Sequence, residues 1–313
     1  MRSRYLVILT GILTLYAAET AAHGQQNQTT LQAAVAAAGP SSAQSPRVNT
    51  PQSFGDRVWS FFRDGEWYFE YGVNKEYWSR SDIHVSQPGL GNNFTLYNVQ
   101  GHDEQCCESE ALTGNLFGPQ YNFRIGRFIT DNIGVELSLD HTKYQSTIGQ
   151  VARVQGTAGN APINGNFTLD NTFFTETLHN GANHLMLNAV YRYPLIGNIN
   201  DTLSLAAIGK AGAGLMIPHT SDTIMGNPVD VGTKSLGNSF GLDRGWWQLN
   251  GVTAGVEGGL RLVLYKPVYV ELTDKVAYSY FGDLPAYMGT MKQSLWMNEA
   301  ILTLGFTYDG TGR

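Results

Sequence analysis

Two short clusters of serine, aspartate and histidine residues are the part of this sequence that could perform acyl-transfer chemistry. Ser81, Asp82 and His84 lie within one short stretch, and His219 precedes Ser221 by two positions. Transfer or hydrolysis of an acyl group requires a hydroxyl or water nucleophile, a histidine base beside it and a carboxylate that orients the histidine. These five residues are therefore candidate catalytic residues, although such residue types also fall close together by chance.

The cysteine and histidine spacings are not typical of a metal or redox site. The adjacent pair Cys106–Cys107 supplies both cysteines of the chain, and this spacing fits neither a CxxC redox motif nor a zinc site. A metal site built from Asp82, His84, Asp140 and His141 is disfavoured, because adjacent residues of a strand point to opposite faces. We therefore expect no metal and no cofactor.

The composition differs from that of an ordinary soluble protein. Only 15% of the 313 residues are charged, whereas charged residues make up about 25% of a typical soluble domain. The chain also contains 36 glycines, 16 tyrosines, 14 phenylalanines and 6 tryptophans, which favours a β-rich structure. The formal net charge is −6 and there is no basic run. We expect no nucleic-acid partner, because neutralising phosphates requires clustered Lys and Arg.

The segments before residue 66 are predicted to lie outside the main domain. Residues 1–22 combine an arginine-flanked apolar stretch with small residues at its end, as in a secretory signal peptide cleaved near Ala22. Residues 23–51 contain almost no large apolar side chain, which predicts a disordered leader. Residues 52–65 place their apolar side chains on one helical face. This segment is predicted to be a short amphipathic helix that either packs against the main domain, residues 66–309, or lies in a membrane interface.

From residue 66 onward the hydrophobic pattern has the period of two that is typical of β-strands. Val135, Leu137 and Leu139, for example, alternate with Glu136 and Asp140. Eight segments share this alternation: 67–76, 121–126, 135–140, 184–192, 203–214, 252–262, 268–275 and 299–306. In each segment one face is apolar, and the opposite face carries polar or charged side chains.

The connections between these segments alternate strictly between short and long. The short connections are 130–132, 196–201 and 266–267, and the long ones are 79–118, 147–182, 218–247 and 282–291. Outer-membrane β-barrels have tight periplasmic turns, long external loops, an even number of strands and strands whose apolar side faces lipid. The pattern therefore predicts an all-β fold, an eight-stranded antiparallel transmembrane up-and-down β-barrel with both termini on the periplasmic side.

This interpretation places the charged side chains of the strands inside the barrel. The predicted lumen ionic network consists of Glu70, Arg124, Glu136, Asp140, Arg192, Lys210, Glu257, Arg261, Glu271, Lys275 and Glu299, with Glu76 and His184 nearby. Positive and negative charges nearly balance, and the interior of an eight-stranded barrel is just wide enough for side chains to fill. Because buried charges persist only when they are paired and hydrogen-bonded, the network is predicted to close the lumen. A conducting pore is the alternative.

Several segments of the barrel region carry a resemblance to known proteins. They are WYFEYGVNKEYWSRSDIHV, FTLYNV, NFRIGRFITDNIGVELSLDHTKY, AGAGLMIPHTSD and the closing ILTLGFTY. As a whole, the region from Glu66 to Tyr308 resembles the small eight-stranded outer-membrane barrels of Gram-negative bacteria, the class that includes the OmpX, OmpW and PagP families. In carrying the first four strings it also resembles a group of uncharacterised exported barrel proteins. ILTLGFTY is similar to the terminal assembly signal of the small outer-membrane barrels, although this chain continues to Arg313 instead of ending on an aromatic residue. The resemblance implies the fold and an outer-membrane location, and it implies no particular activity.

Three functional classes are compatible with these features. We expect an integral outer-membrane protein with a charge-plugged lumen and long external loops, which contacts outer-membrane lipids and lipopolysaccharide in an envelope-interface or ligand-binding role. A hairpin expected from residues 83–85 and 94–99 is the predicted ligand-contact region. The first alternative is a lipid A-modifying hydrolase or acyltransferase, because His219-Thr220-Ser221 resembles the His-x-Ser of PagL-type deacylases, without their flanking Asn-Ala. The second alternative is a small-solute channel.

Overall fold

The computed structural model describes residues 53, 60, 65–103, 120–178, 181–199, 201–230 and 248–309. The predicted signal peptide, the predicted leader, most of the predicted helix and the Cys106–Cys107 pair lie outside these ranges. Within the described ranges no helix has both the length and the apolar character needed to cross a membrane. This part of the chain consists mainly of antiparallel β-strands joined by turns.

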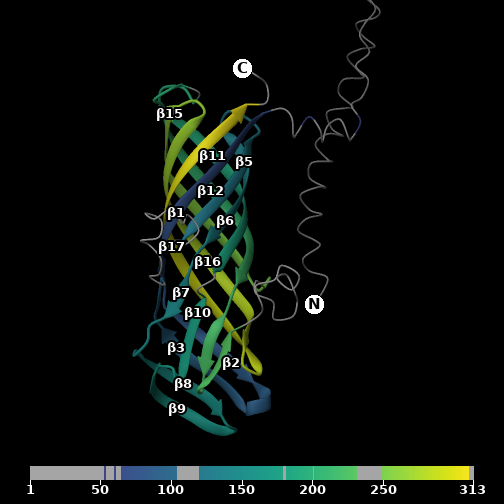
Figure 1. Ribbon diagram of the computed structural model, residues 1–313, viewed down its shortest axis with the longest axis vertical. Coiled ribbons are helices and arrows are strands. Elements are labelled where there is room, and N and C mark those ends of the chain that lie inside the picture. The colour runs from purple at the N-terminus through teal and green to yellow at the C-terminus, as the bar shows by residue number, and fades with distance from the viewer. Residues whose placement is uncertain are drawn as a thin grey trace, which may run out of the picture. The chain divides into compact units, whose positions relative to one another are not determined.

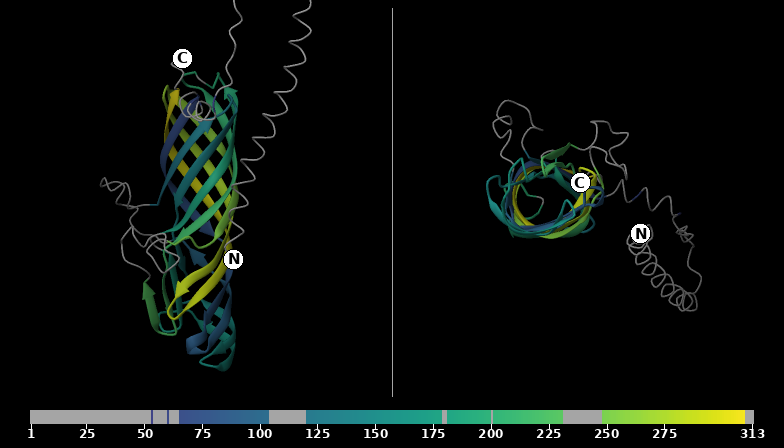
Figure 2. Two further views of the ribbon diagram at one scale, coloured as in Figure 1. Left: turned by 90° about the vertical axis from the view of Figure 1, so that its right-hand side faces the viewer. Right: turned by 90° about the horizontal axis from the view of Figure 1, so that it is seen from below.

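The longest strands form a closed ring (Figure 1). They are β1 (Glu66–Trp78), β5 (Tyr121–Phe128), β6 (Ile133–His141), β11 (Ala182–Ile196), β12 (Leu205–Pro218), β15 (Val252–Tyr265), β16 (Val268–Ala286) and β17 (Gly289–Asp309). Each strand pairs antiparallel with the next in this order, and β17 pairs back with β1. Figure 2 shows the ring along its axis, enclosing a lumen. Because each of these strands has a partner on both sides, the ring has no unpaired edge.

Shorter strands continue the structure beyond the end of the ring that is far from Glu66 and Asp309 (Figure 1). The sheet order continues from β17 through β2 (Ser81–Gln87), β3 (Asn92–Val99), β8 (Val151–Ala158) and β9 (Ala161–Thr168). A second, small sheet has the order β14 (Asn227–Asp230), β13 (Ser221–Ile224), β10 (Phe174–Leu178), β7 (Tyr144–Ser146) and β4 (Gly101–His102). A 3-10 helix, η1 (Pro88–Leu90), joins β2 to β3. We call these elements, with the adjoining ends of β16 and β17, the extension.

The alternation along the ring strands separates apolar from polar side chains. Apolar residues point outward and stay accessible, among them Phe69, Leu137, Leu187, Val256, Leu272 and Leu302. The residues between them in sequence point into the lumen and are buried, as Glu70, Glu136 and Asn188 show. The predicted two-faced strands and their antiparallel, barrel-like arrangement are therefore confirmed.

The extension has an apolar core of its own. Its buried members include Ile83, Val85, Phe94, Leu96, Tyr144, Val154, Phe174, Leu178, Ile224, Phe281, Leu284 and Met291. They come both from strands that continue the large sheet and from the small sheet. The extension is thus a packed structure and not a set of separate loops.

The hairpin between β16 and β17 is longer than the alternation pattern predicts. Residues 282–291 were expected to form a loop, but β16 runs to Ala286 and β17 begins at Gly289. The register shifts between Phe281 and Leu284, after which the two strands remain paired. The physical reason is that Leu284 and its neighbours are buried in the apolar core of the extension. This burial stabilises the paired strands beyond the end of the ring.

Candidate functional site

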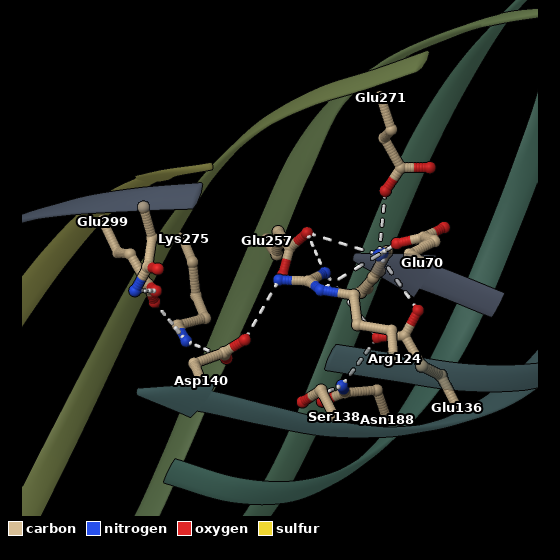
Figure 3. Close-up of polar contacts among 12 residues, drawn as sticks. Glu70, Arg124, Glu136, Ser138, Asp140, Asn188, Glu257, Glu271, Lys275 and Glu299 are labelled. Carbon is tan, nitrogen blue, oxygen red and sulfur yellow. Dashed lines mark hydrogen bonds and ion pairs between the residues drawn. The ribbon is translucent and has the colours of Figure 1, made fainter. Parts of the chain in front are cut away.

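The lumen of the ring contains the most distinctive side-chain arrangement of the described chain. Its members come from seven different strands and are all buried. This lumen network comprises Glu70 (β1), Arg124 (β5), Glu136 and Asp140 (β6), Lys210 (β12), Glu257 and Arg261 (β15), Glu271 and Lys275 (β16) and Glu299 (β17). Figure 3 labels eight of these side chains, all but Lys210 and Arg261, and shows that they converge in the interior. We treat the network as the candidate functional site.

Arg124 contacts four carboxylates of the network. Its Nη1 atom donates a hydrogen bond to Oε1 of Glu257 at 2.6 Å. Its Nη2 atom is 3.5 Å from Oδ1 of Asp140, and Nη1 is 3.7 Å from Oε1 of Glu136. Nε is 3.9 Å from Oε2 of Glu70. Since β5 and β15 are not neighbours in the ring, one guanidinium group connects opposite walls of the lumen.

Lys210 and Arg261 bind the same carboxylates from another side. Nζ of Lys210 is 2.8 Å from Oε1 of Glu271, 3.0 Å from Oε2 of Glu136 and 3.6 Å from Oε2 of Glu70. Arg261 donates through Nη2 to Oε1 of Glu70 at 2.8 Å and through Nε to Oε2 of Glu271 at 2.7 Å. Each of these buried carboxylates therefore has charge-assisted contacts, as buried ions require.

A further group of ionic contacts lies toward the extension. Nζ of Lys275 is 2.5 Å from Oδ2 of Asp140 and also forms an ion pair with Glu299. Asn74 donates through Nδ2 to Oε1 of Glu76 and to Oε1 of Glu299, both at 2.7 Å. Asp140 belongs to this group and to the contacts of the central guanidinium, so the network is continuous along the lumen (Figure 3).

Carboxylates outnumber cations in the lumen. The six carboxylates of the network and the adjacent, buried Glu76 face four cations in the described part of the chain. Arg192, which the alternation assigned to the network, lies apart from it and pairs with Glu66 through Nη1–Oε1 (2.7 Å) and Nη2–Oε2 (2.9 Å). Its guanidinium carbon is 3.7 Å from the ring centroid of Phe128. Arg192 lies apart from the network because it is near the end of β11. At this height its Nε atom donates a hydrogen bond to the carbonyl of Asp131, in the turn that closes this end of the ring.

Two buried tyrosines donate hydrogen bonds to carboxylates of the network, and neither was among the residues predicted for the lumen. The hydroxyl of Tyr68 donates to Oε2 of Glu136 at 2.9 Å. The hydroxyl of Tyr269 donates to Oε1 of Glu70 at 2.8 Å. Both tyrosines occupy inward positions in the alternation of their strands, which is the signal that could have found them.

Glycines on the facing strands make room for these two tyrosines. Tyr68 is opposite Gly126, and Tyr269 is opposite Gly305. A Cβ atom added at either glycine would come within 2.1 Å of the facing aromatic ring. Close approach of a ring to the backbone therefore requires glycine at both positions, and it fixes where each hydroxyl meets its carboxylate.

The candidate residues Ser81, Asp82 and His84 lie on β2 in the extension, and the strand separates them. Ser81 is buried, and its Oγ accepts a hydrogen bond from Nε2 of Gln293 at 2.9 Å. Asp82 is exposed, and its Oδ1 accepts a hydrogen bond from a backbone N–H of β3 at 2.8 Å. His84 is half-buried, with Nδ1 3.1 Å from Oγ1 of Thr95. The serine thus faces the core, whereas the aspartate and the histidine face outward.

The second candidate cluster lies at the start of the small sheet. His219 is buried, and its backbone N–H donates to the carbonyl of Gly181 at 2.9 Å. Ser221 is the first residue of β13 and is opposite Thr177 of β10. His184, which was expected near the lumen, is buried with Nδ1 3.1 Å from Oγ1 of Thr253. None of these contacts joins the cluster to Ser81 or His84.

A metal centre and an apolar pocket are two other kinds of site that could carry a function. Among the residues that the structure describes, no three His, Cys, Asp or Glu side chains are grouped so that they could hold a metal ion. An apolar hollow of about 610 Å³ lies on the outer surface of the ring, bordered by residues such as Phe69, Phe123, Leu137 and Phe306. None of the candidate catalytic residues lines it. The hollow therefore does not bring an acyl chain to those residues.

Comparison with known proteins gives a likeness of fold. Neither a protein-family model nor a curated protein sequence matches the chain. Neisserial surface protein A is 10% identical with a TM-score of 0.34, and the match covers 78% of this chain and 100% of that one. The N-terminal β-barrel domain of Pseudomonas aeruginosa OprF is 13% identical (TM-score 0.30, covering 78% and 98%), and the outer membrane protein OprG from the same organism is 12% identical (TM-score 0.30, covering 79% and 97%). In fold, the chain is similar to small outer-membrane β-barrel proteins.

Proposed function

We propose that this chain is an integral protein of the bacterial outer membrane, with the ring as an eight-stranded transmembrane β-barrel and the extension on the external side. The observation that carries the proposal is the distribution of side chains in the ring. Apolar residues such as Leu302, which is 48% exposed, cover the outside, while the ionic groups are buried inside. Such a surface is favourable where hydrocarbon surrounds it, and a closed ring leaves no backbone group unpaired in that hydrocarbon. The predicted signal peptide, residues 1–22, supports export.

Exposed aromatic side chains at both ends of the apolar surface support the same proposal. Toward the extension they are Tyr77, Tyr278, Tyr280 and Trp296, and toward the end of the ring that contains Glu66 and Asp309 they are Tyr191, Tyr193, Tyr265 and Tyr308. Along β17, the stretch from Trp296 to Tyr308 advances about 40 Å at about 3.3 Å per residue. A strand tilt of about 40° reduces this to about 30 Å, close to the thickness of a bilayer's hydrocarbon core. Aromatic belts at this spacing are typical of membrane interfaces.

The extension supplies the surface for the proposed envelope-interface or ligand-binding role. On the outer face of its large sheet, His84 is opposite both Thr95 of β3 and Lys292 of β17. Exposed basic side chains, Arg153 on β8 and Lys292 among them, lie on the same sheet. We propose that this face contacts ligands and the phosphates of lipopolysaccharide, since exposed cations bind phosphate through charge-assisted contacts.

Fractionation and surface proteolysis of cells that export the protein test the proposal. We expect the protein in the outer-membrane fraction, soluble only with detergent. Protease added to intact cells should cleave within the extension and leave the ring strands as a membrane-bound fragment. A compact monomer released into the periplasmic fraction without detergent would contradict the proposal.

Planar-bilayer recording separates a plugged barrel from a channel. We expect the purified protein to give no steady single-channel conductance, because Arg124 and Lys210 fill the lumen with contacts to carboxylates of several strands. The matched measurement uses Arg124→Ala, which removes contacts to four carboxylates and should allow intermittent ion passage. Steady conductance of the unmodified protein would favour the channel function instead.

Mass spectrometry of lipid A tests the enzymatic alternative. The contacts of Ser81 and His84 lie on opposite faces of β2, so we expect lipid A from cells with and without the protein to have the same acyl composition. The contrary result is a mass shift that disappears in Ser81→Ala, His84→Ala or His219→Ala. That outcome would assign a deacylase or acyltransferase activity to the chain.

A further inference from the structure

Two acidic side chains of the extension are buried opposite each other. Glu176 of β10 and Asp222 of β13 are direct partners in the antiparallel pairing of the small sheet. Their relative exposures are 0% and 3%. All four carboxyl oxygens are buried without a side-chain hydrogen-bond partner in the described part of the chain, and the backbone N–H of Thr177 is the group that hydrogen-bonds to the Asp222 carboxyl and opposes the rise of its pKa. Directly paired residues have Cβ atoms about 5 Å apart, so the two groups share one small space, and we call them the acid pair.

The surroundings of the acid pair are largely apolar. Phe174 and Leu178 flank Glu176 on β10, Ile224 follows Asp222 on β13, and all three belong to the core of the extension. Two carboxylates at this distance in apolar surroundings repel each other and lose their hydration, so they cannot both remain ionised. A shared proton removes one charge and supplies the missing hydrogen bond.

The strands next to the acid pair carry few other side chains that can gain or lose a proton. On β7, the ring of Tyr144 is buried, and the pKa of its hydroxyl is raised by burial and by the charge of Glu176. Val229 of β14 is opposite Asp222 and is uncharged. From β17 and β2, the groups that reach this tyrosine are the neutral side chains Gln293 and Ser81.

Two further buried ionisable residues lie close by in sequence. They are Lys143, just before β7, and His219, three residues before Asp222. If a buried neutral histidine were responsible for a pH effect, acid would weaken the structure, which is the opposite of the effect expected from raised carboxyl pKa values.

We propose that Glu176 and Asp222 form a proton-sharing acid pair that keeps β10 and β13 of the small sheet packed in the extension and releases them as the pH rises. Burial raises the pKa of Glu176 to about 8. Burial, and then the charge of Glu176, raise the pKa of Asp222 well above its usual range. These directions agree with the geometry. The inference concerns the extension alone, and it does not depend on whether the ring crosses a membrane.

The direction of the pH effect follows from the protons bound in each state. With folded pKa values above the unfolded ones, the closed sheet binds more protons than the open sheet, so its stability falls as the pH rises. The stabilisation is fully present below the ordinary carboxyl pKa and is lost up to about pH 8, the folded pKa of Glu176. Within this window the opening equilibrium should increase about tenfold per pH unit for each proton released.

Limited proteolysis at a series of pH values tests the acid pair. We expect cleavage of the intact protein within β10 and β13 to accelerate as the pH rises through this window and then to level off. The double variant Glu176→Gln with Asp222→Asn keeps the shape of both side chains without ionisation, so its cleavage should remain slow throughout. Asp283→Asn, at an exposed position of β16, is the matched control and should behave like the unmodified protein. The activity of the protease itself also changes with pH. Its rate on an unstructured peptide is therefore measured at each pH and used to normalise the cleavage rates.

Infrared spectroscopy gives an independent measurement of the shared proton. The difference between the spectra of the unmodified protein and of the double variant should contain a carbonyl band of a protonated carboxyl group at neutral pH, because the other buried carboxyl groups contribute equally to both spectra. This difference band should weaken as the pH rises through about 8, the pKa of Glu176, and Asp283→Asn should give no such difference band. Identical proteolysis profiles for the unmodified protein and the double variant would overturn the proposal, as would absence of the difference band at neutral pH.

Discussion

Replacement of Arg124 by methionine is expected to lower the free energy of unfolding by about 3–5 kcal/mol, the usual cost of removing one partner from a buried ionic network. Arg124 contacts Glu257 at 2.6 Å, and three further carboxylates lie within 3.9 Å. Methionine fills a similar volume but leaves these carboxylates with fewer cations in a lumen that already contains more carboxylates than cations. The loss therefore reflects uncompensated buried charge more than lost packing.

Equilibrium unfolding in denaturant, with the protein in lipid vesicles, measures this loss. Adding Glu257→Gln to Arg124→Met should recover part of the stability, because it removes the carboxylate that the arginine contacted most closely. The matched control is Arg192→Met, since Arg192 pairs with the partly accessible Glu66 outside the network, and a smaller loss is expected there. Equal losses at both arginines, without recovery in the double variant, would show that the lumen network does not stabilise the ring.

The fold of the ring could be predicted from sequence because its physical constraint is local. A strand that is apolar on one side and polar on the other must alternate at every residue, so segments such as 135–140 and 299–306 can be recognised individually. The short connections then indicate which segments are neighbours, as at 266–267. The bounds of the strands differ from the expected ones mainly at their ends, where pairing continues after the alternation stops.

The structure of the extension could not be predicted in the same way, because it depends on contacts between distant segments. Glu176 and Asp222 lie in two separate long connections, 147–182 and 218–247, and only the pairing of β10 with β13 brings them together. The residues predicted to form a hairpin, 83–85 and 94–99, are indeed paired strands. Nothing in the sequence indicates that this hairpin would extend the large sheet or share a core with the small sheet.

For the lumen, the sequence predicts which side chains point inward but not how far along the barrel axis each one lies. Alternation selects inward positions, and Arg124 and Glu257, which it predicts on the polar face, are buried in the structure. It does not give the height of a residue along the barrel axis, and for this reason Arg192 was assigned to the network although its partner is Glu66. Height depends on strand register and tilt, which the pattern of one strand does not contain.

Introducing arginine at Leu302 is expected to cost about 2–4 kcal/mol in the free energy of folding into a membrane, the usual penalty for a cation on the lipid side near the bilayer midplane. Leu302 is 48% exposed on the outside of β17. It lies midway in sequence between Trp296 and Tyr308, which mark the two proposed aromatic belts. If water surrounded this surface instead, an arginine at an exposed strand position would have little effect on stability.

Comparison of two arginine variants in the same vesicles distinguishes these environments. Tyr265→Arg, at an exposed belt position of β15, should cost no more than about 1 kcal/mol, because long cationic side chains near the interface reach the headgroups. Leu302→Ala controls for the loss of the leucine side chain alone. The depth dependence is the decisive quantity: equal effects of arginine at both positions would mean that hydrocarbon does not surround the middle of the ring. A large penalty confined to Leu302 requires a medium that excludes charge most strongly at the centre of the strand, and a bilayer provides such a medium.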